Sequence, residues 1–248
     1  MRRYFELSRT QTYSLLFAIP LLLLYEAGAA WVATTSDAPL RNGADVLIRA
    51  LLAMGGLHST VGFTAFLVAV AAFAVAVEWR RRKVRGLEPG VFAGMMAESA
   101  LYALLFGMVV GTATQWVLEG AGFRLAADQG GTMAQLPLAE GIVLSLGAGI
   151  YEELLFRVLL AGGLFVLFRS GGLPRTRSGV FAALLSALAF SAFHYVGPYG
   201  DPWQLQSFTF RFLAGLTFSG LFLLRGFGIA AWTHALYDVF LLLFMVGG

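Results

Sequence analysis

Apolar residues dominate the chain in long runs that short polar segments separate. A helix that crosses a hydrocarbon core about 30 Å thick needs about 20 predominantly apolar residues. Seven stretches reach this length, over residues 13–32, 60–79, 91–118, 138–168, 179–196, 205–224 and 229–246. The pattern predicts an all-α fold, a polytopic transmembrane helical bundle of about seven spans, with six and eight as the bounds of that number.

A shorter amphipathic segment lies between the first two spans. Ala44–Met54 places Asp45 and Arg49 on one helical face, a pattern typical of a short helix at the membrane interface. The sequence contains no internal repeat, low-complexity run or polar domain. We therefore expect a single integral-membrane domain over residues 1–248.

Composition narrows the classes of function. Of 248 residues, 58% are hydrophobic and 12% are charged, and the mean hydropathy is +0.76. Soluble domains are about 25% charged, so this chain cannot cover a water-facing surface and is expected to have the lipid bilayer, and no nucleic acid, as its partner. The absence of cysteine excludes disulfides, thiolate zinc sites and thiol proteases. The sequence leaves the oligomeric state open.

The basic residues are unevenly distributed between the two sides of the predicted bundle. Twelve of the 17 Lys and Arg residues precede the first span or follow the second, fourth or sixth, and only three lie in the opposite set of loops. Cytoplasmic loops carry the excess of Lys and Arg, which predicts a cytoplasmic N-terminus. The preference for Arg, at 16 residues, over Lys, at one, suggests a GC-rich bacterial genome and hence a bacterial inner membrane.

Ionisable residues inside the predicted spans are the candidates for function, because each costs about 2.5–3.5 kcal/mol at the bilayer centre on insertion scales. Nine of them are the candidates: Glu26, Glu98, Glu152, Glu153, Arg157, His194, Arg211, His234 and Asp238. Six of the nine fall into three motifs within the last hundred residues. Of the others, Glu26 is expected to hydrogen bond within the bundle. Arg211 could reach the interface, bind lipid head groups or hold a substrate carboxylate.

The first motif, Glu152-Glu153-x-x-x-Arg157, lies in the fourth span. Glu153 and Arg157 are four residues apart on a helix and can pair, which offsets part of the cost of burying each charge. Glu152 lies about 100° around an α-helix from Glu153 and has no partner in the sequence. It can therefore face a polar cavity and act as a general base. The alternative is a structural Glu–Arg pair with a second carboxylate that reaches the interface.

The other two motifs carry histidines. Phe190-x-x-x-His194 lies in the fifth span, where a single histidine is more typical of a packed, hydrogen-bonded residue than of a catalyst. His234-x-x-x-Asp238 lies in the seventh span, where both side chains share one helical face and the carboxylate can set the tautomer and charge of the imidazole. Taken alone, this pair fits a functional site and a structural pair equally.

The three motifs together resemble those of the CAAX-protease and bacteriocin-processing (CPBP) family of membrane endopeptidases, which includes the type II CAAX prenyl endopeptidases. That family carries Glu-Glu-x-x-x-Arg on one span, Phe-x-x-x-His on the next, and His-x-x-x-Asn or a variant near the end. The resemblance covers residues 138–246, which it identifies as the catalytic core, formed by the C-terminal four spans. The first 130 residues match only in being membrane spans.

The resemblance implies an intramembrane glutamic endopeptidase that hydrolyses a peptide bond near the membrane-associated end of a protein or peptide. Glu152 would activate water, His194 would bind or orient that water, and His234 with Asp238 would stabilise the oxyanion. Glu153 and Arg157 would be supporting residues. The family often has Asn at the position of Asp238. Since an ionised Asp cannot donate to an oxyanion, either Asp238 is protonated or it holds His234 as an imidazolium that donates alone.

Alternatives remain for the cofactor and for the activity. We expect no metal or other cofactor, with zinc bound by Glu152, His194 and His234 as the alternative. A non-proteolytic membrane scaffold or a proton-coupled transporter of the same fold would use the same groups as a structural network or a proton relay. The expected substrate is membrane-anchored, and its identity and cleavage sequence do not follow from this chain.

Overall fold

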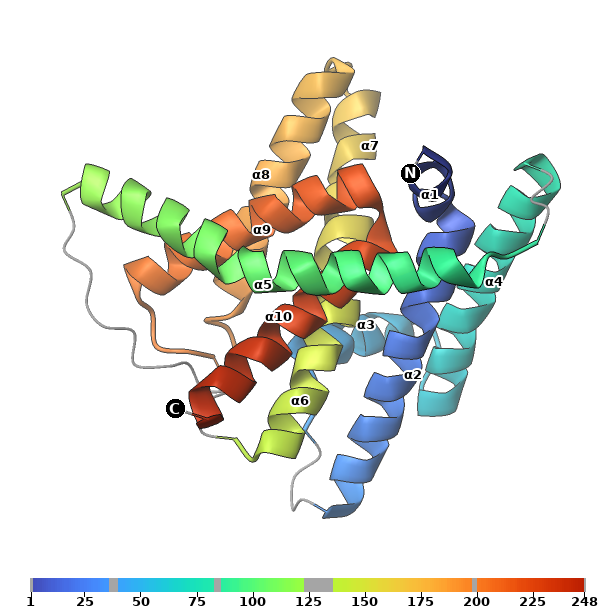
Figure 1. Cartoon of the computed structure of the whole chain (residues 1–248), viewed down its shortest axis with the longest axis horizontal. Helices are drawn as coiled ribbons and strands as arrows, with labels where there is room; N and C mark the ends of the chain where they lie inside the picture. The colour runs from blue at the N-terminus through green and yellow to red at the C-terminus, as the bar shows by residue number, and fades with distance from the viewer. Residues whose placement is uncertain (1, 36–39, 83–85, 123–135, 198–199, 248) are drawn as a thin grey trace.

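All regular secondary structure in the described part of the computed structural model is helical; this part comprises residues 2–35, 40–82, 86–122, 136–197 and 200–247 (Figure 1). Three of the basic residues counted for the predicted orientation lie outside these described residues, namely Lys83, Arg85 and Arg124. The elements are α1 (Arg2–Ser8), α2 (Gln11–Thr35), α3 (Gly43–Met54), α4 (Thr60–Arg82), α5 (Pro89–Gly120), α6 (Leu138–Gly147), η2 (Ala148–Ala161), α7 (Gly162–Ser170), α8 (Arg175–Phe193), α9 (Leu205–Arg225) and α10 (Phe227–Gly247).

Each of the seven predicted apolar stretches is helical, and the predicted all-α polytopic bundle is confirmed. Six helices are long and apolar enough to cross a membrane: α2, α4, α5, α8, α9 and α10. The remaining stretch, residues 138–168, is a continuous helical segment made of α6, η2 and α7. It differs from the others because its middle turns carry Glu152, Glu153 and Arg157, all buried. The chain is an integral membrane protein.

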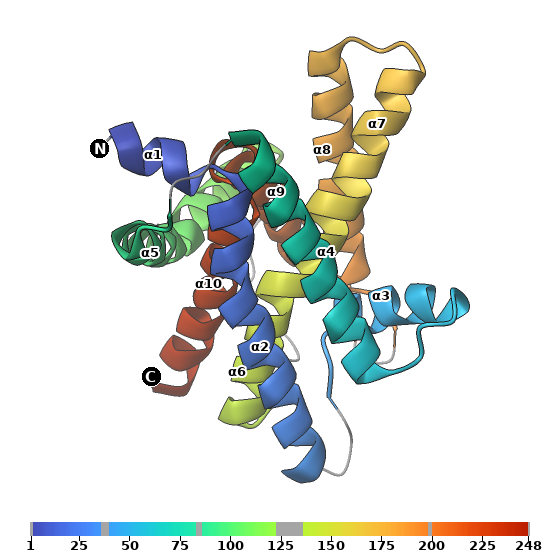
Figure 2. The ribbon, with the colours of Figure 1, turned by 90° about the vertical axis from the view of Figure 1, so that its right-hand side faces the viewer.

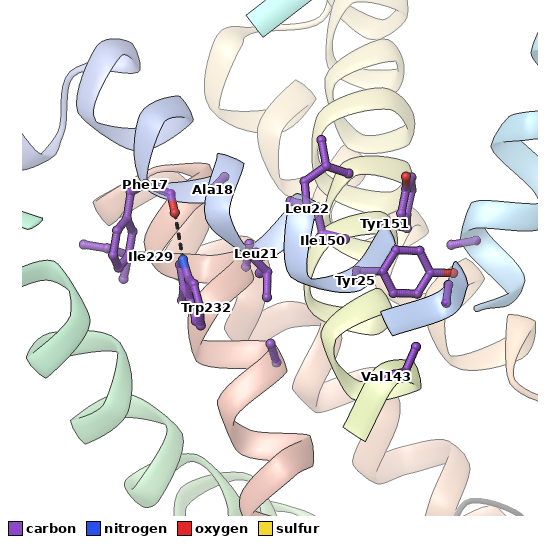
Figure 3. Close-up of a cluster of buried hydrophobic side chains, with 14 of the residues drawn as sticks. Phe17, Ala18, Leu21, Leu22, Tyr25, Val143, Ile150, Tyr151, Ile229 and Trp232 are labelled. Carbon is purple, nitrogen blue, oxygen red and sulfur yellow. Dashed lines mark hydrogen bonds between the residues drawn. The ribbon is translucent and has the colours of Figure 1, made fainter. Parts of the chain in front are cut away.

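Helix α10 lies at the centre of the bundle and packs against α2, α5, α6, α9 and η2. Figure 3 shows the core between α2, η2 and α10, where Leu21, Ile150 and Ile229 are buried together. The indole of Trp232 on α10 donates to the carbonyl of Phe17 on α2 at 2.8 Å. The two helices that frame the site, η2 and α10, are thus held by the same apolar core.

The predicted interfacial segment is helix α3, which begins at Gly43 and ends at Met54. Asn42 caps its N-terminus, since the Asn42 side chain accepts from the backbone N–H of Ala44 at 2.9 Å. Asp45 and Arg49 share one face, as the spacing predicted, and form an ion pair at 2.5 Å. Helix α3 packs against η2 and projects to the side of the bundle (Figure 2).

A single residue, Gly226, connects α9 to α10. Its φ of 87° is a left-handed conformation that favours glycine, and its N–H donates to the carbonyl of Phe222 at 2.8 Å. Two residues later the N–H of Gly228 donates to Ser14 Oγ on α2 at 2.8 Å. The tight turn therefore sets where α10 begins against α2, and with it the position of His234.

Candidate active site

Glu152 is a buried carboxylate on η2 whose two oxygens have different surroundings. Its Oε1 accepts a hydrogen bond from Asn42 Nδ2 at 2.8 Å. Its Oε2 has no hydrogen-bond partner in the described part of the chain. This oxygen lies 3.9 Å from Nε2 of His194 and 4.0 Å from Nε2 of His234. Residues from the three predicted motifs therefore converge on one carboxylate oxygen.

His194 follows the last residue of α8 and is held by its own motif. Its Nδ1 donates to the carbonyl of Phe190 at 2.9 Å, and the Phe190 ring meets the imidazole edge-on at 5.0 Å. Because a carbonyl oxygen can only accept, Nδ1 carries the proton, and Nε2 of the neutral ring is the acceptor that faces Glu152. The spacing Phe190-x-x-x-His194 thus fixes both the orientation and the tautomer of the histidine.

His234 on α10 is held on two sides. Its Nδ1 lies 2.9 Å from Glu153 Oε1, and its ring stacks on Phe218 with the centroids 4.4 Å apart. Its Nε2 is 3.7 Å from Asp238 Oδ2, in the pairing that the four-residue spacing predicted. An ionised carboxylate can only accept, so Nδ1 of His234 also carries a proton. The ring presents Nε2 between Glu152 and Asp238.

Arg157 supports this arrangement through its pair with Glu153. The predicted pair is confirmed, with Arg157 Nε 3.2 Å from Glu153 Oε2 and both side chains almost fully buried. The guanidinium also lies 4.4 Å from the ring centroid of Phe190 and 5.3 Å from that of Phe218. Since these two rings contact His194 and His234, Arg157 supports both histidines through their aromatic neighbours.

The local helix differs from the expectation. The spacing argument assumed an α-helix around Glu152, whereas Ala148–Ala161 form a π-helix. Its wider turn, with i→i+5 bonding, places Glu152, Glu153 and Arg157 all on the buried side of the segment. π-Helical turns inside helices occur frequently at functional sites. No local sequence rule distinguishes this geometry, because it depends on which side chains the neighbouring helices accommodate.

The members of the cluster differ in their exposure to solvent. The His194 side chain is 25% exposed and that of Asp238 is 18% exposed. The side chains of Glu152 and His234 are less exposed, at 8% and 6%. The cluster is therefore most accessible at His194 and Asp238, while Glu152 and His234 lie deeper.

Asn42 is the contact that sequence reasoning missed. It precedes the short helix α3, and Asn before such a helix is a typical N-cap signal. That signal explains its contact with Ala44 but not the one with Glu152, which lies 110 positions along the chain. Only the packing of α3 against η2 brings the two together.

The remaining candidates lie outside the cluster around Glu152. Glu26 is in an ion pair with Arg49 at 2.5 Å and accepts from the hydroxyl of Tyr151 at 2.6 Å, which confirms the expected bonding within the bundle. Glu98 accepts two hydrogen bonds from Arg225, at 2.6 and 2.7 Å, and joins α5 to α9.

The third, Arg211, forms an ion pair with Asp201, a partner that none of the three readings of this residue included. Its guanidinium also lies 5.3 Å from the ring centroid of Tyr195. Arg211 thus borders the segment that follows His194 rather than the carboxylate at the centre of the cluster.

A metal site at the cluster would need three or more ligating side chains arranged around one point. Among the described residues, no group of three or more His, Asp or Glu side chains is arranged to hold a metal ion. The chemistry that the arrangement offers directly is that of a carboxylate base beside two imidazoles.

The comparisons with known proteins agree with the motifs. Residues 134–240 match the family model described as type II CAAX prenyl endopeptidase Rce1-like, and this range contains all three motifs. No curated protein and no solved structure matches the chain. Residues 134–240 of this integral membrane protein thus form a domain of the type II CAAX prenyl endopeptidase Rce1-like family, a family of membrane proteases.

Proposed function

We propose that this protein is an intramembrane endopeptidase of the glutamic type that cleaves near the membrane-associated end of its substrate. The observation that carries the proposal is the placement of Glu152 Oε2, buried and without a hydrogen-bond partner among the described residues, about 4 Å from Nε2 of both histidines. Groups separated by this distance can be bridged by a single water molecule. A water held there contacts a base and two imidazoles at once.

In the first step Glu152 takes a proton from this water. Because Nδ1 of His194 donates to Phe190, Nε2 of His194 can accept one hydrogen of the water while the other points at Glu152 Oε2. The water oxygen then presents a lone pair to the scissile carbonyl carbon. As the C–O bond forms, the proton moves to Glu152, and the carbonyl π electrons move to its oxygen.

In the second step His234 stabilises the negative charge on that oxygen. The ring of His234 lies within 4.0 Å of three carboxylates, those of Glu152, Glu153 and Asp238, and the guanidinium of Arg157 pairs with Glu153. This excess of negative charge favours a positive charge on the imidazole, whose Nε2–H then donates to the oxyanion. Collapse of the intermediate breaks the C–N bond, and the proton on Glu152 passes to the departing amine nitrogen.

The position of the site supports a membrane-anchored substrate. His194 and Asp238, the exposed members, are at the end of α8 and within α10, so the scissile bond must reach a site inside a membrane-embedded bundle. A chain tethered to the bilayer by a lipid or an apolar segment meets this requirement. The family description names prenylated CAAX chains, in which the lipid is carried on a cysteine near the C-terminus.

The test uses the purified protein in liposomes and an internally quenched, farnesylated peptide that ends in Cys-a-a-X. We expect cleavage by the wild type and a loss of about 10²–10⁴-fold in kcat for Glu152→Gln, the range that general-base catalysis contributes. Glu119→Gln, which changes an exposed glutamate on α5, is the matched control. Equal cleavage by Glu152→Gln and the wild type would refute the assignment of the base.

A second experiment addresses the substrate without assuming prenylation. Proteomes of a wild-type strain and a Glu152→Ala strain are compared for membrane-anchored or secreted proteins with unprocessed termini. The proposal predicts a small set of such proteins in the variant. Identical termini in both strains, together with no cleavage of the farnesylated peptide, would favour a non-proteolytic scaffold or transporter.

A further inference from the structure

Asn42 uses both ends of its side-chain amide, and each has a different partner. Its Oδ1 accepts from the N–H of Ala44 at 2.9 Å, so the amide orientation is fixed by the helix that it caps. With the oxygen so occupied, Nδ2 points to η2 and donates to Glu152 Oε1 at 2.8 Å. The residue is 8% exposed, and its donor has no competition from bulk water.

The backbone of Asn42 is held as firmly as its side chain. Its N–H donates to the hydroxyl oxygen of Tyr25 at 3.1 Å, and the same hydroxyl donates to Asp45 Oδ2 at 2.8 Å. Figure 3 shows the Tyr25 ring extending from α2 within the buried core. A side chain at Gly147 would meet the Tyr25 ring at 2.5 Å and Asn42 Cβ at 2.9 Å. Glycine at position 147 therefore allows Asn42 to approach η2.

A second set of contacts ties α3 to the same turn of η2. Asp45 is in ion pairs with Arg41 at 2.7 Å and with Arg49 at 2.5 Å. Arg49 continues the chain of contacts to Glu26, which accepts from Tyr151, the residue next to Glu152. These contacts, together with the Asn42–Glu152 hydrogen bond, fix helix α3 to η2. The Asn42 amide therefore cannot move away from Glu152 without disturbing them.

We propose that Asn42 is a positioning residue for the base: its amide holds Oε1 of Glu152, which turns Oε2 toward His194 and His234. The last torsion of a glutamate side chain is broad and approximately two-fold, so the carboxylate has little intrinsic preference for one orientation. The donor from Asn42 supplies that preference and compensates part of the desolvation of the buried charge. The inference rests on the function proposed above, in which Oε2 takes the proton.

Two substitutions separate this role from helix capping. Asp and Ser both cap helix N-termini about as well as Asn, so Asn42→Asp and Asn42→Ser keep the bond to Ala44. An ionised Asp cannot donate to Glu152, and a Ser hydroxyl is too short to reach it while it caps α3. We expect Asn42→Ser to fold with a modestly lowered thermal midpoint in detergent, because Glu152 loses a donor. Asn42→Asp should have the lower midpoint of the two, because it places a second buried carboxylate beside Glu152.

The decisive measurement is the split between kcat and KM on the farnesylated peptide. Asn42→Asp and Asn42→Ser should each lower kcat by about 10²-fold with KM unchanged, since a misoriented catalytic group costs rates of this order. A wild-type kcat in Asn42→Ser would overturn the proposal and leave Asn42 as a cap only. If that variant keeps its kcat while Glu152→Gln loses it, the positioning role fails alone. If Glu152→Gln is fully active, both proposals fail.

Discussion

Glu153 on η2 and His234 on α10 are joined by a contact of 2.9 Å between Oε1 and Nδ1. The same carboxylate lies 3.2 Å from Arg157 through its other oxygen. Glu153 is therefore shared between a buried guanidinium and the imidazole assigned to the oxyanion. The sequence predicted Glu153 only as the partner of Arg157, but Glu153 also orients His234. The Glu-Glu-x-x-x-Arg motif on η2 is therefore connected directly to α10.

Loss of Glu153 should cost both stability and activity. Glu153→Ala leaves Arg157 buried without its carboxylate, so we expect a loss of about 3–5 kcal/mol in unfolding free energy, measured by denaturation in detergent. The double variant Glu153→Leu/Arg157→Met removes the whole pair and should regain most of that stability.

The same double variant separates folding from catalysis. It should remain without activity, because His234 has lost its Nδ1 partner. Wild-type cleavage by a stable double variant would show that the contact between Glu153 and His234 has no part in the reaction.

Gly149 allows η2 to approach α10 at the level of the site. A Cβ at this position would meet the carbonyl oxygen of Ala231 at 2.5 Å and Cβ of Ala235 at 2.6 Å. We expect Gly149→Ala to destabilise the protein by about 1–3 kcal/mol, the usual cost of overpacking, and to lower kcat by separating Glu152 from His234.

Gly163 provides the matched control for this substitution. It lies in α7, the continuation of the same helical segment, and an added Cβ there has no atom within 4 Å. Gly163→Ala should leave the melting temperature and the activity unchanged or slightly raise the stability. Equal effects of the two substitutions would contradict the close packing of η2 on α10.

The ion pair of Arg211 with Asp201 holds the segment that follows His194. The N–H of Asp201 donates to the carbonyl of His194 at 2.9 Å, so Arg211 on α9 reaches the backbone of the histidine through Asp201. Arg211→Met should lower kcat by about tenfold through a less ordered His194. The exchange Arg211→Asp/Asp201→Arg should regain part of the rate, and a result no better than the single variant would exclude this role.

Asp238 differs from the Asn of the motif pattern that the sequence resembles. Its Oδ2 lies 3.7 Å from His234 Nε2, so an amide placed there could donate toward the same oxyanion. In Asp238→Asn the gained N–H donor would stabilise the oxyanion, whereas the lost negative charge would weaken the imidazolium form of His234. These two effects on kcat oppose each other. We expect Asp238→Asn to keep kcat within about threefold and Asp238→Leu to lose about 10²-fold, since it supplies neither. Wild-type rates in Asp238→Leu would remove this residue from the site.

In the proposed reaction Glu152 activates the nucleophilic water directly, and no metal ion is required. Incubation with a strong chelator, followed by the farnesylated-peptide assay, should leave kcat unchanged, and the purified active protein should contain less than stoichiometric zinc. Zinc bound by Glu152, His194 and His234 is the competing arrangement. Activity that chelation abolishes and added zinc restores would establish it.

The sequence alone predicted the helical bundle because the bilayer imposes a length and a polarity on every span. The stretch at residues 205–224, for example, is helix α9 to within one residue. The pair of Glu153 with Arg157 and that of His234 with Asp238 were also predictable, since both partners lie on one helix. Such local relations follow from spacing, whatever the rest of the chain does.

Relations between helices needed the tertiary structure. The spacing of Glu152 and Glu153 does not predict the π-helical turn that buries both. It also does not predict the hydrogen bond from Asn42, the N-cap of α3. These depend on how closely α3, η2 and α10 approach, which Gly147 and Gly149 permit. The sequence determined which charged groups are placed in the membrane, because that cost is local. The tertiary structure decided which oxygen of Glu152 faces the histidines, because that choice depends on packing between distant segments.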